Sequence, residues 1–146
     1  MSFTMTLQEC QEYLAGLHVG IVSVAEEERG PLCVPVWYAY EPGGEVWFIT
    51  ARNSRKAKLI ERAGRFSLCA QDETSPYKYV SVEGPLVGFG RAEDEEHVRF
   101  MARRYLGIEG GDQYTTEVLN DPNCPEEVVI RLRPERWLSA DYSKPG

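Results

Sequence analysis

The chain has 146 residues, of which 42% are hydrophobic and 27% are charged, and its formal net charge is −7. This length fits one domain over residues 1–146, with enough buried surface for a core that needs no disulfides. The negative charge argues against nucleic acid or an anionic membrane as the main partner, because both are bound through a broad basic surface.

The N-terminal residues contain neither the basic nor the apolar segment of a secretory signal, and no apolar run approaches the length of a membrane span. Four cysteines, Cys10, Cys33, Cys69 and Cys124, are far apart and form no C-x-x-C motif. We therefore expect reduced thiols, no metal site and a cytoplasmic location.

The first half of the chain predicts one helix and three strands. The helix begins at a capping box, in which Thr6 is followed three residues later by Glu9. Continuous apolarity over 32–40 indicates a strand buried on both faces, or one that lies between a core and a ligand. Pro35 places an edge or a bulge in that strand, because proline donates no ladder hydrogen bond. The expected elements are a helix over 6–17 and strands over 19–25, 32–40 and 45–50, the last two joined by a hairpin turn at 41–44.

The second half predicts two helices and three further strands. Gly64 is the expected C-cap of the first of these helices, and glycines at 84 and 88 indicate a bend or bulge in a long strand. The expected elements are helices over 54–63 and 92–107, strands over 66–71, 77–90 and 128–133, an irregular segment over 107–125 with one helical turn at 114–119, and a tail over 134–146. Strands that follow one another as hairpins, without a βαβ repeat, predict a mainly β fold: an antiparallel sheet or small barrel with flanking helices.

The charge of one helix is unusual. Segment 52–65 holds six basic residues and one acid, a local charge of +5 that leaves −12 for the rest of the chain. Four of the basic residues crowd the helix N-terminus, which carries partial positive charge and normally attracts acids. One interpretation is a phosphate site, made by free N–H groups, the Ser54 hydroxyl and the Arg55 guanidinium. The alternative is a solvated basic helix that pairs with acids elsewhere in the chain.

Common catalytic motifs are absent from the sequence, including G-x-S-x-G, H-E-x-x-H, G-x-x-x-x-G-K-[ST] and G-x-G-x-x-G. The two histidines, His18 and His97, are far apart in sequence, and we expect them at the surface or in the core. No general acid is identified. Catalysis by such a chain would depend on a cofactor that carries the reactive atoms.

A cofactor of this kind needs an anion clamp and a flat slot for a ring, and two segments supply candidates. A hairpin from 31–40 to 45–50 would bring the segments close together. For the aromatic residues the alternative is packing in the barrel core. The clamp candidates are Thr50, Ser54, Arg55 and Lys56, and the slot candidates are Pro35, Val36, Trp37 and Tyr38.

The same segments carry a resemblance to a known family. The motifs, in order, are Val34-Pro35-Val36-Trp37-Tyr38, Trp47-Phe48-x-Thr50-x-x-x-Ser54-x-Lys56, Phe66-Ser67-Leu68 and Tyr77-x-Tyr79-Val80-x-Val82-Glu83-Gly84. Over about residues 6–140 this order resembles the pyridoxamine 5'-phosphate oxidase-like split-barrel superfamily. Within the superfamily it is most similar to the flavin/deazaflavin-dependent oxidoreductases of the B type.

The resemblance implies a homodimeric antiparallel split β-barrel, with the cofactor in a groove at the subunit interface. It implies that the main chain of 35–38 lies along the tricyclic ring and that Tyr77 and Tyr79 border the groove. Lys58 is a candidate for binding a longer anionic tail of the cofactor. The residues that the resemblance assigns to the cofactor phosphate are Thr50, Ser54, Arg55 and Lys56.

Two departures from the family pattern bear on the activity. The strand over 34–40 lacks the Arg and Lys of true pyridoxamine-phosphate oxidases, and the C-terminal region reads Glu135-Arg136-Trp137 where those enzymes have Glu-Phe-Trp. Oxidation of vitamin B6 is therefore not expected. The Pro-x-Trp-Tyr stretch favours the deazaflavin coenzyme F-420 over FMN.

Three hypotheses follow. The first is an oxidoreductase that passes hydride from a bound reduced deazaflavin to a small conjugated substrate, which the sequence does not identify. The second is an FMN-dependent oxidoreductase on the same barrel. The third is a protein without enzymatic activity that carries a flavin, haem or another small anion in the same groove.

Overall fold

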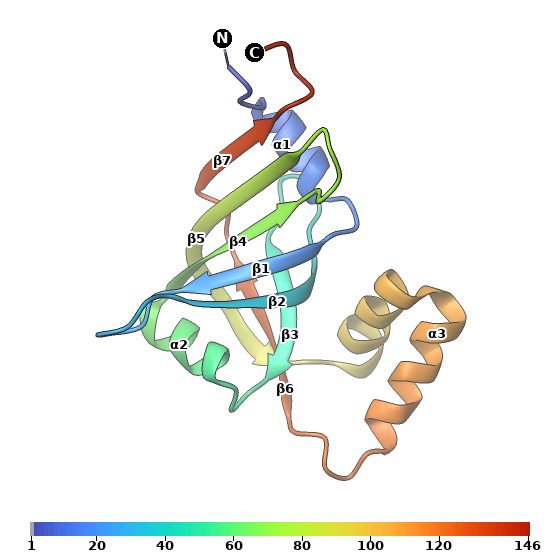
Figure 1. Cartoon of the computed structure of the whole chain (residues 1–146). Coiled ribbons are helices and arrows are strands. Elements are labelled where there is room, and N and C mark those ends of the chain that lie inside the picture. The colour runs from blue at the N-terminus through green and yellow to red at the C-terminus, as the bar shows by residue number, and fades with distance from the viewer. Residues whose placement is uncertain (1) are drawn as a thin grey trace.

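The computed structural model describes residues 2–146, which form a closed antiparallel barrel of six strands with flanking helices (Figure 1). The strands neighbour one another in the order β4-β1-β2-β3-β6-β5, and β5 pairs back with β4 to close the ring. β7 lies outside the ring and pairs with the first half of β5. The predicted mainly β, antiparallel barrel is therefore confirmed. The strands are β1 Val19–Val24, β2 Leu32–Ala39, β3 Val46–Ala51, β4 Arg65–Gln71, β5 Lys78–Arg91, β6 Glu127–Leu132 and β7 Arg136–Asp141.

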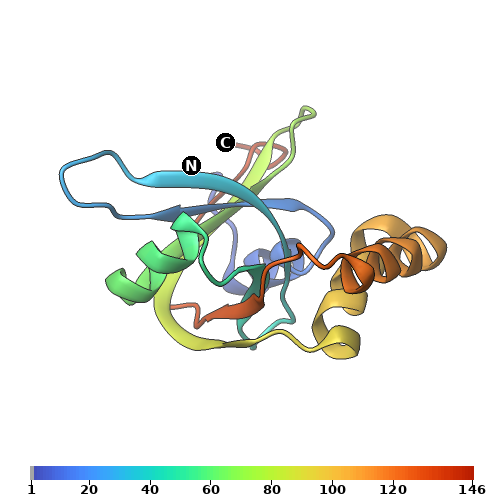
Figure 2. The same ribbon diagram turned by 90° about the horizontal axis from the view of Figure 1, so that it is seen from below.

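Two helices cover the ends of the barrel. Helix α1, Leu7–Leu14, buries Cys10 and Leu14, and helix α2, Arg55–Ala63, buries Ala57 and Ile60. Figure 2 shows α2 lying across the lower end of the barrel, where it packs against β1, β4 and β5. At the other end the Tyr38 hydroxyl donates to the Leu14 carbonyl oxygen at 2.7 Å. The apolar core is thus enclosed by the inward faces of the strands and by one face of each helix.

The ends of these helices follow from their sequences. The predicted capping box is confirmed: the Thr6 hydroxyl accepts from the Glu9 N–H, and the Glu9 carboxylate accepts from the Thr6 N–H. The helix ends at Leu14, earlier than the expected residue 17, because the carbonyls of the next two residues turn toward Arg104. Gly64 caps α2 in the left-handed region with φ 73°, as its sequence position predicts.

β2 and β5 are irregular at the positions that proline and glycine indicate. β2 pairs with β1 over 32–37 but with β3 only at 38 and 39, so Pro35 lies on a strand edge without a partner there, as expected. In β5 the register shifts between Leu86 and Gly88, which confirms the predicted bulge. A Cβ on Gly84 would lie 1.8 Å from the Arg133 carbonyl oxygen, so only glycine fits where residues 133–135 cross β5.

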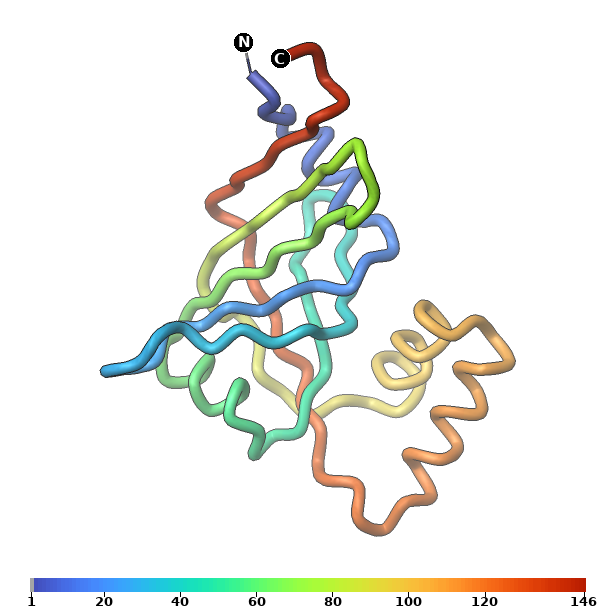
Figure 3. Tube along the Cα trace, viewed as in Figure 1, coloured from blue at the N-terminus to red at the C-terminus, as the bar shows by residue number. Residues whose placement is uncertain are grey.

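The prediction of an irregular segment over 107–125 is wrong for residues 107–120, which are helical well beyond the single turn expected at 114–119, and correct for residues 121–125. The chain forms a π-helical turn η1, Asp94–Arg99, and continues as helix α3, Phe100–Asn120, which bends back at Gly107 with φ 80° and ψ 174°. The Asp112 carboxylate joins the two arms by accepting from Arg99 at 2.7 Å and from Arg103 at 2.7 and 2.9 Å. We call residues 94–120 the helical hairpin; Figure 3 shows its two arms beside the barrel.

The second arm of the helical hairpin begins with three glycines, at 107, 110 and 111, which have low helix propensity. Gly111 allows the two arms to approach closely, because a Cβ there would lie 2.5 Å from the Arg103 Cα. The helical conformation of this arm therefore comes from packing against the first arm rather than from local propensity. Within residues 2–146, no helix combines the length and the apolar character that crossing a membrane requires.

The prediction of a C-terminal tail without structure is also wrong. Arg136–Asp141 form β7, which pairs with residues 78–83 of β5. Strand pairing satisfies the main-chain groups along an edge of β5 that β6 does not reach. The Asp141 N–H then donates to the Phe3 carbonyl at 2.8 Å, which places the two ends of the chain side by side (Figure 1).

One face of the sheet β2-β1-β4-β5-β7 has no helix over it in the part of the chain that the structure describes (Figure 1). Register places Val19 opposite Trp37, and Ile21 opposite both Pro35 and Cys69, so these side chains share the outward side. Val19, Ile21 and Leu138 are 53%, 37% and 64% exposed. We call this surface, defined by Val19, Ile21, Pro35, Cys69 and Leu138, the outer apolar face.

The hydroxyl of Tyr105 links the helical hairpin to the barrel. It accepts from the Tyr38 N–H at 2.9 Å and donates to the His18 carbonyl at 2.5 Å. In Tyr105→Phe the Tyr38 N–H loses its partner, so we expect the free energy of unfolding to fall by about 1–3 kcal/mol, measured by chemical denaturation. Tyr114→Phe is the control, because no residue from 2 to 146 hydrogen-bonds the Tyr114 hydroxyl. Equal stability of the two variants would contradict the prediction.

Candidate functional site

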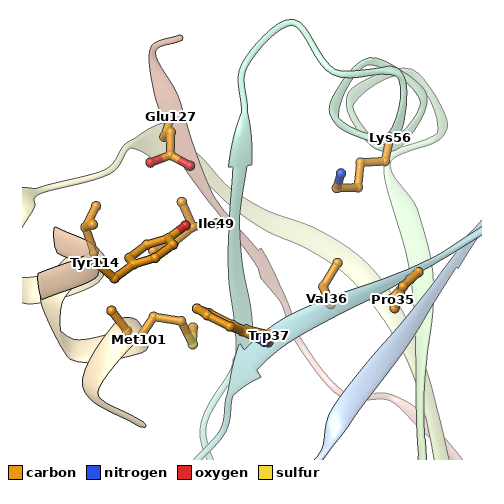
Figure 4. Close-up of a pocket in the computed structure, with 10 residues that line it drawn as sticks. Pro35, Val36, Trp37, Ile49, Lys56, Met101, Tyr114 and Glu127 are labelled. Carbon is orange, nitrogen blue, oxygen red and sulfur yellow. The ribbon is translucent and has the colours of Figure 1, made fainter. Parts of the chain in front are cut away.

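A cavity of about 170 Å³ lies between the barrel wall and the helical hairpin (Figure 4). It opens where β2 diverges from β3, since those strands pair at only two residues. Three strands, α2 and both arms of the hairpin contribute to it. The lining residues are Pro35, Val36 and Trp37 of β2, Ile49 of β3, Glu127 of β6, Lys56 of α2, and Val98, Met101, Ala102 and Tyr114 of the hairpin.

An aromatic cluster fixes one wall of the cavity. The Trp37 ring stacks on Tyr105, with centroids 5.0 Å apart and planes within 5°, and lies tilted 5.7 Å from the Tyr114 ring. Arg104 donates to the carbonyls of Tyr38 at 3.0 Å and Gly16 at 2.8 Å. These contacts hold the hairpin against β2, so the flat indole surface has a fixed position.

The polar groups of the cavity lie on opposite sides of it. In Figure 4 the Lys56 amino group points into the opening from α2, and the Glu127 carboxylate and Tyr114 hydroxyl lie across from it. No acid between residues 2 and 146 forms an ion pair with Lys56. A lysine in the first turn of a helix, where the dipole is already positive, makes this side of the cavity attractive to an anion such as a phosphate.

The turn before α2 is built by two hydroxyls. The Ser54 Oγ accepts from the Ala57 N–H at 3.2 Å as the N-cap and lies 3.2 Å from the Thr50 Oγ1. Thr50 is only 6% exposed. Both residues, which we expected to bind phosphate, therefore position the first turn of α2, from which Lys56 extends.

The structure divides the basic segment between residues that pair with acids and a lysine that lines the cavity. Arg55 forms an ion pair with Glu26, and Arg65 pairs with Glu83 at 3.5 Å and Glu135 at 3.3 Å. For these two arginines the interpretation as partners of acids elsewhere in the chain is the one that the structure supports. Lys56 alone among the predicted clamp side chains lines the cavity.

The structure brings four of the predicted cofactor residues to one cavity: Pro35, Val36, Trp37 and Lys56. Tyr38 contributes no side chain, because it is 0% exposed inside the barrel, and its N–H and carbonyl are bonded to Tyr105 and Arg104. Lys58 borders a different hollow, on the outer side of α2, with Arg55 and Arg62.

Tyr77 and Tyr79 do not reach the cavity within one chain. Tyr77 is 54% exposed and precedes β5, and Tyr79 pairs with Gln71 of β4 and Ala140 of β7. Register nevertheless puts the Tyr79 side chain on the outward side of the sheet that carries the outer apolar face. The pair would border a cavity only through a second copy of the chain.

Sequence reasoning missed Glu127. Its carboxylate lines the cavity, and none of residues 2–146 donates a hydrogen bond to it or forms an ion pair with it. Burial raises the pKa of Glu127 above the ordinary 4.5. Burial, followed by the charge of Glu127, raises the pKa of the Tyr114 hydroxyl. The only sequence signal was an acid at the start of an apolar strand, which is common at strand ends.

The barrel, with a cavity beside a basic helix N-terminus, has the form of a split-barrel protein that binds a phosphorylated cofactor. The family model described as pyridoxamine 5'-phosphate oxidase matches residues 6–140. The chain belongs to this family, which confirms the resemblance seen in its motifs. Membership supports a flavin-type cofactor and oxidoreductase chemistry at the level of the family.

Solved structures share the fold at low sequence identity. The conserved hypothetical protein Rv2991 of Mycobacterium tuberculosis is 21% identical with a TM-score of 0.75, and the match covers 99% of this chain and 92% of that one. A protein named F420 reductase is 17% identical, with a TM-score of 0.66 over 88% and 94% of the two chains.

A third structure, an FAD-binding protein of Mesorhizobium loti, is 18% identical, with a TM-score of 0.61 over 92% of this chain and 93% of that one. No curated protein matches this sequence. At these identities the structural matches show the fold alone.

Substitutions at Ser54 test its capping role. Ser54→Ala should lower the free energy of unfolding by about 0.5–2 kcal/mol, because the Ala57 N–H loses its acceptor. Ser54→Asp should retain most of the stability, because aspartate is an equally good N-cap. Thermal or chemical denaturation measures both, and a loss of equal size in the two variants would show that the cap is not the reason for the effect.

Proposed function

We propose that the protein is an oxidoreductase that passes hydride from a bound reduced deazaflavin, F-420, to a small conjugated substrate. The observation that carries this proposal is the Lys56 amino group, which points without an acidic partner into a cavity with a flat indole wall. Family membership supports a flavin-type cofactor. The deazaflavin is favoured by the Pro35-x-Trp37-Tyr38 stretch, and a structural neighbour bears the name F420 reductase.

The residues present fit a phosphorylated tricyclic cofactor. Lys56 and the first turn of α2 would hold the phosphate, while Thr50 and Ser54 keep that turn in place. Arg55, already paired with Glu26, would add to the positive potential without a direct contact. When bound, the reduced cofactor supplies the hydride, and the protein's share is to orient it and to exclude water.

The ring would lie along the unpaired edge of β2. Main-chain groups of 35–37 on that edge face the gap toward β3 rather than a neighbouring strand. They are free to hydrogen-bond the polar atoms of a planar ring, and Trp37 would limit its position on the hairpin side. FMN is the second candidate cofactor on the same surfaces, because it shares the phosphate and the planar ring, and an FAD-binding protein has the same fold.

We also propose that the working protein is a homodimer. A cavity of about 170 Å³ is smaller than the roughly 300–1,000 Å³ usual for ligand pockets, so one chain supplies only part of the groove. The outer apolar face is suited to cover it, because Pro35 belongs both to that face and to the cavity rim. Packing two such faces together would bring Tyr77 and Tyr79 of one copy toward the cavity of the other.

Titration with F-420 and FMN in parallel, followed by Trp fluorescence, tests the cofactor proposal. Lys56→Ala should weaken binding by about 1.5–3 kcal/mol, the range for a hydrogen bond to a charged group. Lys58→Ala is the matched control, since Lys58 borders a different hollow, and we expect its affinity to stay within about twofold of wild type. Failure of both cofactors to bind at micromolar concentration would overturn the proposal, and binding without turnover would favour a carrier protein.

The dimer is tested by one charged substitution on the outer apolar face. Ile21→Glu, at a position 37% exposed in the single chain, should convert the dimer to a monomer because it would bury an unpaired carboxylate. Light scattering coupled to size-exclusion chromatography measures the mass. Leu119→Glu, at a site 46% exposed on the helical hairpin, is the control and should leave the mass unchanged. A monomeric wild type would remove the dimer proposal.

A further inference from the structure

We propose that Glu127 is the proton donor of the site, and this inference rests on the proposed hydride transfer. Reduction of a conjugated bond by hydride needs a proton as well, and the motifs identify no group that supplies it. Glu127 is the one carboxylic acid that lines the cavity between the barrel wall and the helical hairpin. Its position on β6, across the cavity from Lys56, separates it from the side proposed for the cofactor phosphate (Figure 4).

The surroundings of Glu127 favour a carboxyl group that keeps its proton. Glu127 is opposite Ala51 on the outward side of the β3–β6 pair, under the helical hairpin, where Met101 and Ala102 are buried. No basic group among the described residues compensates its charge by an ion pair. The desolvation that raises its pKa is the effect by which general acids are poised in enzyme sites.

The charged and titratable groups around Glu127 come from four parts of the chain. They border either the cavity or a second, open hollow that Glu127 also lines. The set contains three carboxylates, two cations, one tyrosine and one cysteine. They are Tyr114 of α3, Lys56 of α2, Asp121, Cys124 and Glu126 of the connection to β6, and Arg91 and Asp94 near η1. Burial, rather than any of these charges, is what raises the pKa of Glu127.

The second hollow gives Glu127 access to solvent. Its volume is about 520 Å³, and Glu127 and Val98 belong to its lining as well as to that of the cavity. Glu127 therefore lies at the boundary between a cavity that would hold substrate and an opening through which water can return a proton. A general acid needs both contacts to act in successive turnovers.

The proposed step moves one hydride and one proton to the substrate. One carbon of the substrate's conjugated bond accepts hydride, which is one hydrogen with two electrons, from the reduced deazaflavin or flavin. The π electrons of that bond move to the neighbouring atom, which takes the proton of the Glu127 carboxyl group as its O–H bond breaks. Glu127 is left as a carboxylate and regains a proton from water, while the substrate has gained two hydrogens and the cofactor has lost two electrons.

A test on the cofactor-free protein measures the proton on Glu127 directly. Because the pKa is raised in the folded state, the contribution of Glu127 to stability is present below pH 4.5 and is lost as the pH rises through the folded-state pKa. We therefore expect equal melting temperatures for wild type and Glu127→Gln near pH 4, and a variant more stable by roughly 2 °C or more at pH 7–8. Glu126→Gln changes the neighbouring exposed acid and is the control. Its melting temperature should not rise above that of wild type as the pH increases from 4 to 8.

A second measurement uses the loaded enzyme. Bound reduced cofactor is mixed with a panel of conjugated ketones and quinones, and its oxidation is followed by absorbance. Glu127→Gln should slow the single-turnover rate roughly a hundredfold or more, with cofactor affinity unchanged, and should abolish the fall of the wild-type rate at pH values above the Glu127 pKa. Glu126→Gln should retain both the rate and the pH profile.

The outcomes separate the two proposals. Failure of the cofactor to bind, or of every acceptor to oxidise it, overturns the proposed function. Oxidation of the cofactor at the same rate and with the same pH profile in Glu127→Gln overturns the role of Glu127 alone. Melting curves of wild type and Glu127→Gln that coincide at every pH also overturn it, because the carboxyl group would then hold no proton at working pH.

Discussion

The separation of β2 from β3 is the constraint on which the rest of the structure depends. Two strands of a closed barrel that pair at only two residues leave main-chain groups along one edge without strand partners. At Tyr38 the helical hairpin supplies the partners, through the Tyr105 hydroxyl and the Arg104 guanidinium. Beyond Tyr38, toward Pro35, the edge faces the cavity. The unpaired edge of β2 therefore binds the helical hairpin at Tyr38 and provides a surface for a ligand near Pro35.

The cations of the basic segment have different surroundings. The basic segment in an acidic chain looks uniform in sequence, yet Arg55 and Arg65 have acidic partners at the surface while Lys56 faces the cavity. Exposed ion pairs contribute little to stability. What matters here is position: Lys56 is the basic side chain of this segment that lines the cavity, at the first turn of α2.

Local patterns predicted most of the barrel. Capping at Thr6, the glycine C-cap at 64, the edge at Pro35 and the bulge near Gly88 are all set by backbone chemistry within a few residues. The full helix beyond Gly107, of which only a turn at 114–119 was predicted, and the strand β7 both depend on contacts outside their own stretch of sequence. In the first case Arg99 and Arg103 hold Asp112, and in the second β5 offers an unpaired edge.

The residues of the candidate site also divide into those that local motifs predicted and one that depends on distant segments. Pro35, Val36, Trp37 and Lys56 lie within two neighbouring motifs, so their proximity follows from one hairpin. Glu127 had no comparable signal, because its burial results from a helical segment that only the structure places over β6. Tyr77 and Tyr79 remain expectations that depend on a second chain.

The helical hairpin leaves and rejoins the barrel at neighbouring points. It leaves the barrel after Arg91 and returns at Glu127, and these points are adjacent: Arg91 is opposite Val128, and the Ala92 N–H donates to the Glu127 carbonyl at 2.9 Å. Since departure and return share one rung of the ladder, the intervening residues can lengthen, shorten or diverge while the ring of strands keeps its register. The wall that would select substrates can thus vary independently of the scaffold that supports it.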